Sequence, residues 1–100
     1  MEKVALEPEY KDKIMGILTV LFPKAKIYLF GSRARGTHSD RSDIDLAIDE
    51  GKAIRPRRIG EANNMFAESN IPYSIDVVDM HSISEKMKEL ILKEGILWKP

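Results

Sequence analysis

The alternating segment at positions 43–49, Asp-Ile-Asp-Leu-Ala-Ile-Asp, constrains the fold more than any other part of this chain. Because successive side chains of a β-strand point to opposite faces, it predicts a strand with one apolar and one acidic face. Such a strand belongs in a sheet that packs one face on a core. The apolar face would carry Ile44, Leu46 and Ile48, and the other face Asp43, Asp45, Ala47 and Asp49.

The flanking segments predict two more strands and three helices. The strands are recognised by β-branched and aromatic residues, and the helices by apolar residues at helical spacing. The expected strands are residues 26–30 and 74–79. The expected helices run between Pro8 and Pro23, over residues 56–69, and from a cap at Ser82 or Ser84 to Gly95.

These elements, in the order helix, strand, strand, helix, strand, helix, predict an α+β fold. We expect two layers, with the helices packed on a small mixed sheet. The apolar tail at residues 96–98 either docks on the body of the protein or adds an edge strand. No repeat and no linker interrupts the sequence, so residues 1–100 are predicted to form a single domain.

Charge and composition exclude several classes of function. Lys plus Arg and Asp plus Glu are equal at 16, so the chain lacks the broad positive field of a dedicated nucleic-acid binder. With no cysteine, it forms no disulfide and no thiolate-bound metal site. The N-terminus does not resemble a secretory signal, and the longest apolar stretch, at residues 14–22, is too short to cross a bilayer. We therefore expect a cytoplasmic protein without a membrane partner.

A glycine turn follows the first predicted strand. Gly31 and Ser32 stand where this strand ends, and Arg33-Ala-Arg-Gly36 follows them. Glycine lets the backbone approach a ligand closely, and the N–H groups of such a turn form a concave site for anions. The turn therefore predicts a phosphate site. If a short helix begins there, the positive end of its dipole would add to the attraction for phosphate.

Two aspartates on one face of the second strand predict a metal site. Asp43 and Asp45 lie two residues apart, so their side chains are neighbours. Mg²⁺ is held by one or two carboxylates together with substrate phosphates and water. Without a cation, two such carboxylates repel each other and are costly to desolvate. The alternative is that both simply face solvent on an amphipathic strand.

Asp76 stands in the middle of an otherwise apolar strand and is the third acidic candidate. Three carboxylates on neighbouring strands could hold two cations in the arrangement used for displacement at phosphorus. Asp76 would then be a metal ligand and the proton acceptor for the attacking hydroxyl. The alternatives are an edge-strand charge that deters aggregation, or Asp79 as the third carboxylate. Asp79 would point to the opposite face, so Asp76 is favoured.

The glycine turn followed by Ser42-Asp-Ile-Asp-Leu46 resembles the signature of the polymerase-beta-like nucleotidyltransferase superfamily. Its minimal nucleotidyltransferases are the most similar members, and the resemblance covers nearly the whole chain. It implies that Gly31 and Ser32 grip the triphosphate, and that Asp43, Asp45 and Asp76 bind Mg²⁺ or Mn²⁺. ATP is the expected substrate.

The resemblance also implies a partner. Minimal nucleotidyltransferases are often encoded beside a small helical protein of the HEPN class, and some act as antitoxins that nucleotidylate a tyrosine on it. A chain of this length leaves little room to position an acceptor, so a HEPN-type subunit or a second copy is expected to complete the site.

Several residues keep two interpretations at this stage. Arg33, Arg35 and Arg41 either contact the triphosphate or belong to a solvated loop, and Ser42 either binds the nucleotide or belongs only to a turn. Neither His38 nor His81 stands at a spacing typical of a catalytic triad or of a zinc site. Two rival functions also remain: a module that neutralises a helical partner by contact alone, and an RNA-modifying subunit.

Overall fold

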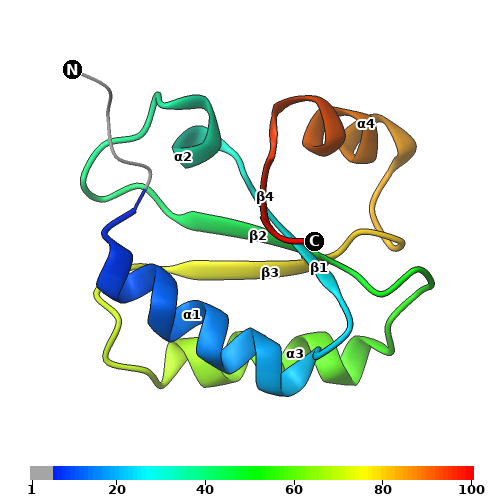
Figure 1. Cartoon of the computed structure of the whole chain (residues 1–100), viewed down its shortest axis with the longest axis horizontal. Helices are drawn as coiled ribbons and strands as arrows, with labels where there is room; N and C mark the ends of the chain where they lie inside the picture. The colour runs from blue at the N-terminus through cyan, green and yellow to red at the C-terminus, as the bar shows by residue number, and fades with distance from the viewer. Residues whose placement is uncertain (1–5) are drawn as a thin grey trace.

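The computed structural model describes residues 6–100 and is organised around one mixed sheet (Figure 1). The strand order is β3-β2-β1-β4. β1 is antiparallel to both of its neighbours, whereas β2 and β3 run parallel. The strands are β1 (Lys26–Phe30), β2 (Ile44–Asp49), β3 (Ile75–Asp79) and β4 (Ile96–Lys99).

The helices begin and end at residues that favour those positions. The two longest helices both start with proline, which is tolerated in a first turn because an N–H there would have no partner within the helix. The last helix is capped by Ser84, whose hydroxyl accepts from the Met87 N–H at 3.2 Å. The helices are α1 (Pro8–Leu21), α2 (Ser32–Arg35), α3 (Pro56–Ala67) and α4 (Glu85–Glu94). No helix among residues 6–100 has the length and apolarity needed to cross a bilayer.

The predicted α+β fold with a mixed sheet is confirmed, with three differences. The structure contains two elements that the predicted order does not include. They are the single turn α2, and β4, which is one of the two alternatives for the apolar tail. β2 begins at Ile44 rather than at Asp43, because pairing with the third strand starts with the Ile44 N–H donating to Ser74 O.

The main core lies on the sheet face that α1 and α3 cover. The apolar face of β2 is fully buried there, as its alternation predicted, and α1 and α3 contribute apolar side chains at helical spacing. We call this side of the sheet the first face. Its buried residues include Ile14, Leu18, Ile27, Leu29, Ile44, Leu46, Ile48, Ala62 and Phe66.

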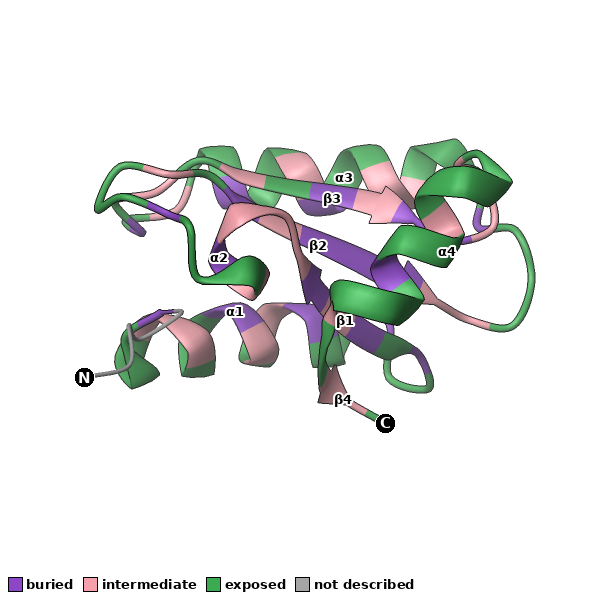
Figure 2. Cartoon of the chain, turned by 90° about the horizontal axis from the view of Figure 1, so that it is seen from above, coloured by how far each residue is buried: buried purple, intermediate pink, exposed green. Residues whose placement is uncertain are grey.

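The opposite side, the second face, is also partly covered by α4, which adds a third layer to the expected arrangement. α4 packs Ile91 on Ala47 and Met80, with Tyr28 and Val78 beside them. Figure 2 shows α4 over one end of the sheet, while the ends where β2 and β3 begin stay uncovered. The second face needs this third layer because its middle is apolar and would otherwise face water. Asp45 and Asp76 lie at the end of this face that α4 leaves open, and Asp49 lies at its far end.

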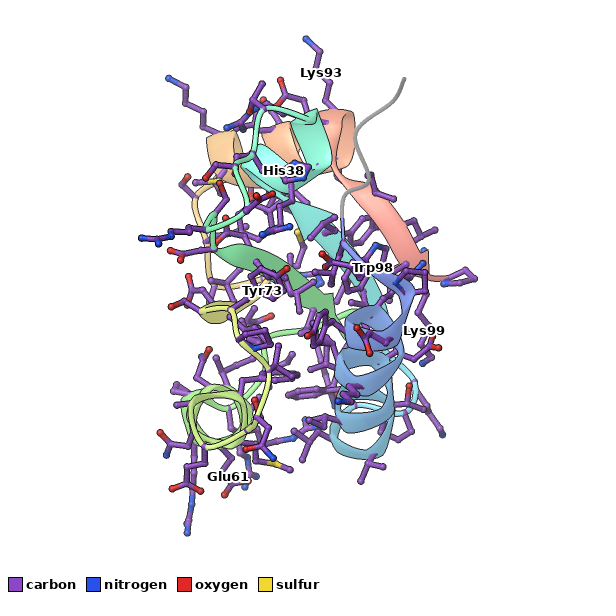
Figure 3. The ribbon with its side chains drawn as sticks, turned by 90° about the vertical axis from the view of Figure 1, so that its left-hand side faces the viewer. His38, Glu61, Tyr73, Lys93, Trp98 and Lys99 are labelled. Atoms are coloured by element: carbon purple, nitrogen blue, oxygen red, sulfur yellow. The ribbon has the colours of Figure 1, made fainter. Side chains whose placement is uncertain are left out.

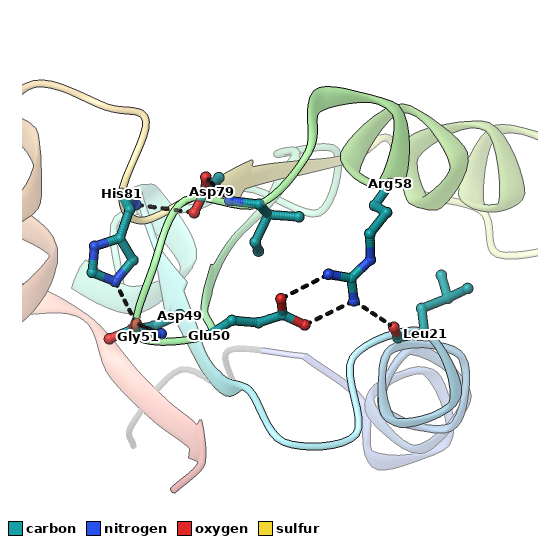
Figure 4. A network of polar contacts seen from close by, with 8 residues as sticks. Leu21, Asp49, Glu50, Gly51, Arg58, Asp79 and His81 are labelled. Carbon is teal, nitrogen blue, oxygen red and sulfur yellow. Dashed lines mark hydrogen bonds and ion pairs between the residues drawn. The ribbon is translucent and has the colours of Figure 1, made fainter.

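A polar network joins the helices to the far end of the sheet, away from that open end (Figure 4). Arg58 on α3 donates to both carboxylate oxygens of Glu50 at 2.7 and 2.8 Å, and to Leu21 O at 3.2 Å. Its guanidinium also lies over the Phe22 ring at 4.9 Å. One arginine thus ties the end of α1 to the start of α3 and to the end of β2.

Candidate active site

The glycine turn packs directly against a carboxylate of the neighbouring strand. Gly31 has φ of 78° and ψ of −157°, a conformation almost restricted to glycine. A Cβ atom at this position would overlap Oδ2 of Asp45. The absence of a side chain therefore lets the turn approach Asp45, and Ser32 follows as the half-buried first residue of α2.

The sheet register places Asp76 beside Asp45. The two are paired residues of the parallel strands β2 and β3, so their side chains lie on the same face. Phe30, which precedes the glycine turn, is the partner of Asp45 on the other side. The open end of the second face thus carries two neighbouring carboxylates and the turn.

Electrostatics at Asp45 reflect this crowding. Burial raises the pKa of Asp45 above its usual value, and the charges of Asp76 and Asp43 raise it further. The charge of Arg35 acts in the opposite direction. Like charges held together in a partly desolvated place are a feature of functional sites, because a bound cation relieves their repulsion.

The donor set fits a hard divalent cation that also binds substrate. Asp43 is exposed and lies just before β2, so it is not held on the strand face as expected. In the described part of the chain, no three acidic or histidine side chains already form a metal cluster. The expected convergence of three carboxylates is therefore only partly realised. Mg²⁺ nevertheless needs only one or two carboxylates when phosphates and water complete its shell.

Arg35 lies at the rim of the site. It forms an ion pair with Glu94 of α4 at 3.7 Å, and both side chains are partly exposed. A pocket of about 130 Å³ opens beside it, lined by Phe30, Gly31, Arg35, Met87, Leu90, Ile91 and Glu94. A larger groove of about 520 Å³ runs between α1 and α3, away from the carboxylates.

Arg33 and His38 are buried rather than solvated, and Ser42 is half-buried in the loop before β2. The Arg33 side chain is buried and donates to Ser42 O, and the Ser42 hydroxyl accepts from the Ser39 N–H at 2.9 Å. His38 is also buried. Among the nucleotide-binding candidates, Gly31, Ser32 and Arg35 therefore border the open site, whereas Arg33 and Ser42 stabilise the loop that leads to Asp43.

Asp79 differs from Asp76 in both position and surroundings. It points to the opposite face and is 4% exposed. Burial alone would raise the pKa of Asp79, but hydrogen bonds from Ile54 N–H, His81 N–H and the Ser82 hydroxyl lower it below its usual value. Figure 4 shows part of this cluster. Asp79 therefore stabilises the loops at the far end of the sheet and does not belong to the site.

Asp79→Ala is expected to destabilise the fold by about 2–4 kcal/mol, since it leaves the buried Ile54 N–H without an acceptor. The stabilisation from Asp79 is present above its unfolded pKa, and it is lost as the pH falls through the lower folded value. Asp76→Ala should leave stability within about 0.5 kcal/mol, because Asp76 is exposed. Urea unfolding at pH 7 compares the two, and equal losses would contradict the assignment.

Comparisons with known proteins identify the family of this chain. The family model described as polymerase beta, nucleotidyltransferase, matches residues 12–98. The chain belongs to this nucleotidyltransferase family. A probable protein adenylyltransferase MntA from Haemophilus influenzae is 34% identical over 77 residues, which cover 77% of this chain and 68% of the relative. A protein adenylyltransferase MntA from Shewanella oneidensis is 31% identical over 86 residues, 85% of this chain and 61% of that protein.

Solved structures of toxin–antitoxin complexes contain the same fold. A toxin–antitoxin complex with AMP-PNP aligns with a TM-score of 0.77 and 30% identity, over 90% of this chain and 73% of the other. The Shewanella oneidensis MNT antitoxin complex with its tri-AMPylated HEPN toxin aligns at a TM-score of 0.74 and 26% identity, over 95% and 74%. The chain therefore spans between 61% and 74% of the length of these four proteins.

Two residues beside the site escaped the sequence analysis. Tyr73 precedes β3 and contacts Arg33, and Asn63 of α3 bonds the β3 backbone next to Asp76. The Asn63 amide accepts from the Val77 N–H at 2.9 Å and donates to Val77 O at 3.0 Å. An aromatic residue just before a strand that carries an aspartate is a weak signal for Tyr73. No local sequence pattern indicates the role of Asn63.

Proposed function

We propose that this nucleotidyltransferase transfers the AMP group of ATP to a hydroxyl group of a partner protein. The observation that carries the proposal is the register of β2 and β3, which sets Asp76 beside Asp45 next to the Gly31 turn. Two paired carboxylates beside a phosphate-binding turn are suited to nucleotidyl transfer.

Each residue has a distinct part in the proposed reaction. The Gly31 and Ser32 turn and the Arg35 guanidinium bind the triphosphate, and Asp43, Asp45 and Asp76 would hold Mg²⁺ or Mn²⁺. The bound cation supplies charge neutralisation on the phosphates. The acceptor oxygen forms a bond to the α-phosphorus while the bond from this phosphorus to the bridging oxygen of pyrophosphate breaks. Asp76 accepts the hydroxyl proton, as its exposed carboxylate is open to an incoming group.

The acceptor is proposed to come from a second protein. Asp43 and Asp76 are exposed, so an incoming side chain has access to them. The similar antitoxin is described in complex with an AMPylated HEPN toxin, which favours a HEPN-class partner and an antitoxin role here. We further propose that the protein acts in the cytoplasm, where ATP is available.

Incubation of the purified chain with ATP, Mg²⁺ and its HEPN-class partner tests the proposal. Intact-mass spectrometry should show the partner gaining one or more adenylyl groups, with equimolar pyrophosphate released. The matched reaction with Asp43→Ala/Asp45→Ala should show none. If this double variant still suppresses the partner's toxicity completely, the chain acts by contact alone and the proposal fails.

A further inference from the structure

Arg33 has an unusual place for an arginine in a polar turn. It is the second residue of α2, immediately after the phosphate-binding turn, yet only 4% of its surface is exposed. Arginine is rarely buried unless its guanidinium has several partners. Its guanidinium contacts include two other segments of the chain, and each of these segments leads to a carboxylate of the site.

The first contact is with the loop before β2. Arg33 Nε donates to Ser42 O at 3.0 Å, and Nη2 donates to Asp40 O at 3.4 Å. Ser42 directly precedes Asp43, and β2 begins at Ile44. These hydrogen bonds therefore fix the end of the loop from which Asp43 and Asp45 are presented.

The second contact is with the segment before β3. The Arg33 guanidinium lies over the Tyr73 ring, 4.6 Å from its centroid. Figure 3 shows Tyr73 beside the ends of β2 and β3 that face the viewer. Tyr73 is itself held by α1, because its hydroxyl donates to Glu7 at 3.0 Å and its ring meets Tyr10 edge to face at 5.5 Å. Its position is thus well defined, three residues before Asp76.

We propose that Arg33 is a positioning residue for the transfer reaction, joining the glycine turn to the segments that present Asp43, Asp45 and Asp76. This inference rests on the proposed function but assigns Arg33 no contact with ATP. The role requires directed N–H donors and a flat face that stacks on an aromatic ring. Guanidinium provides both, whereas a lysine ammonium provides charge without either geometry.

The expected consequence is a loss in turnover rather than in substrate binding. Loosening the segments displaces the carboxylates relative to the triphosphate, and a displacement of about 1 Å costs roughly 100-fold in rate. Arg33→Lys should therefore lower kcat by about 10- to 100-fold, with KM for ATP changed less than about 3-fold. Tyr73→Leu removes the stacked ring, together with its contacts to Glu7 and Tyr10, but keeps the Arg33 hydrogen bonds, and it should lower kcat in the same way but less.

Arg58→Lys is the matched control. Arg58 also combines hydrogen bonds to a backbone carbonyl with stacking over an aromatic ring, but it does so at the far end of the sheet. Both Arg58→Lys and Arg33→Lys should melt at a lower temperature than the wild type. Only Arg58→Lys should keep the kcat of the wild type. Assays at a temperature where all variants are folded separate positioning from general stability.

Hydrogen exchange of the free proteins completes the test, since it needs no catalysis. Amides of residues 39–45 and 73–76 should exchange faster in Arg33→Lys than in the wild type, and not in Arg58→Lys. Unchanged exchange in both segments, or a higher KM for ATP with unchanged kcat, would overturn the positioning role. A wild type that shows no transfer refutes the proposed function alone, because the exchange result stands independently.

Discussion

Asp45→Asn is expected to lower adenylyl transfer by about 1,000-fold or more while the fold survives. The substitution removes one carboxylate of the proposed metal site, and the loss of a single preorganised group at a transition state costs about 100- to 1,000-fold. Asparagine has nearly the same shape, so the contact with the Gly31 turn remains. Steady-state transfer measured by intact mass checks the size of the loss.

The same variant should melt at or above the wild-type temperature when no metal is present. Burial and the charges of Asp76 and Asp43 raise the pKa of Asp45, so ionising it costs more in the folded than in the unfolded state. The folded protein then binds more protons over the range between the two pKa values, and its stability falls as the pH rises through that range. Asparagine removes this cost. Mg²⁺ with ATP should raise the melting temperature of the wild type only.

Asp49→Asn is the matched control on the same strand. Burial would raise the pKa of Asp49, but hydrogen bonds from Gly51 N–H at 2.7 Å and from His81 lower it overall. Its ionised form therefore stabilises the fold, and asparagine should destabilise it by about 1 kcal/mol without changing kcat. If Asp45→Asn instead melts well below the wild type, Asp45 belongs to a structural network rather than to a metal site.

Gly31→Ala is expected to damage both the fold and the proposed active site. Its backbone lies in a region that residues with a side chain avoid at a cost of about 1–3 kcal/mol, and the added Cβ would overlap the Asp45 carboxylate. Either the turn or Asp45 must move. We expect a stability loss of about 2–4 kcal/mol and a fall in kcat of about 100-fold.

Gly36→Ala separates these two effects. Gly36 also has a positive φ, 76°, but a Cβ there would meet nothing within 4 Å. Only the backbone cost of about 1 kcal/mol should appear, with kcat within a few-fold of the wild type. Urea unfolding and steady-state assays of the two variants measure both quantities. Similar losses of kcat in both would mean that approach to Asp45 is unimportant.

Local patterns predicted most of the elements because their causes are local. The alternation in residues 43–49 is repeated on the observed first face, and proline and Ser84 mark helix starts where the structure has them. The start of β2 at Ile44 was not predicted, because it depends on a hydrogen bond to Ser74, which is distant in the sequence. The third layer could not be predicted from local patterns, because the face of the sheet that α4 packs on is formed by residues from separate strands.

The sequence by itself determined the chemistry: a glycine turn, an acidic strand and a further aspartate in an apolar strand, each recognisable from adjacent residues. The tertiary structure decided which of these groups meet. The parallel register sets Asp76, not Asp79, beside Asp45, and packing turns Arg33 inward to the loops rather than outward to solvent. A slip of one residue would reverse every side chain of a strand, and only contacts between distant segments select the register.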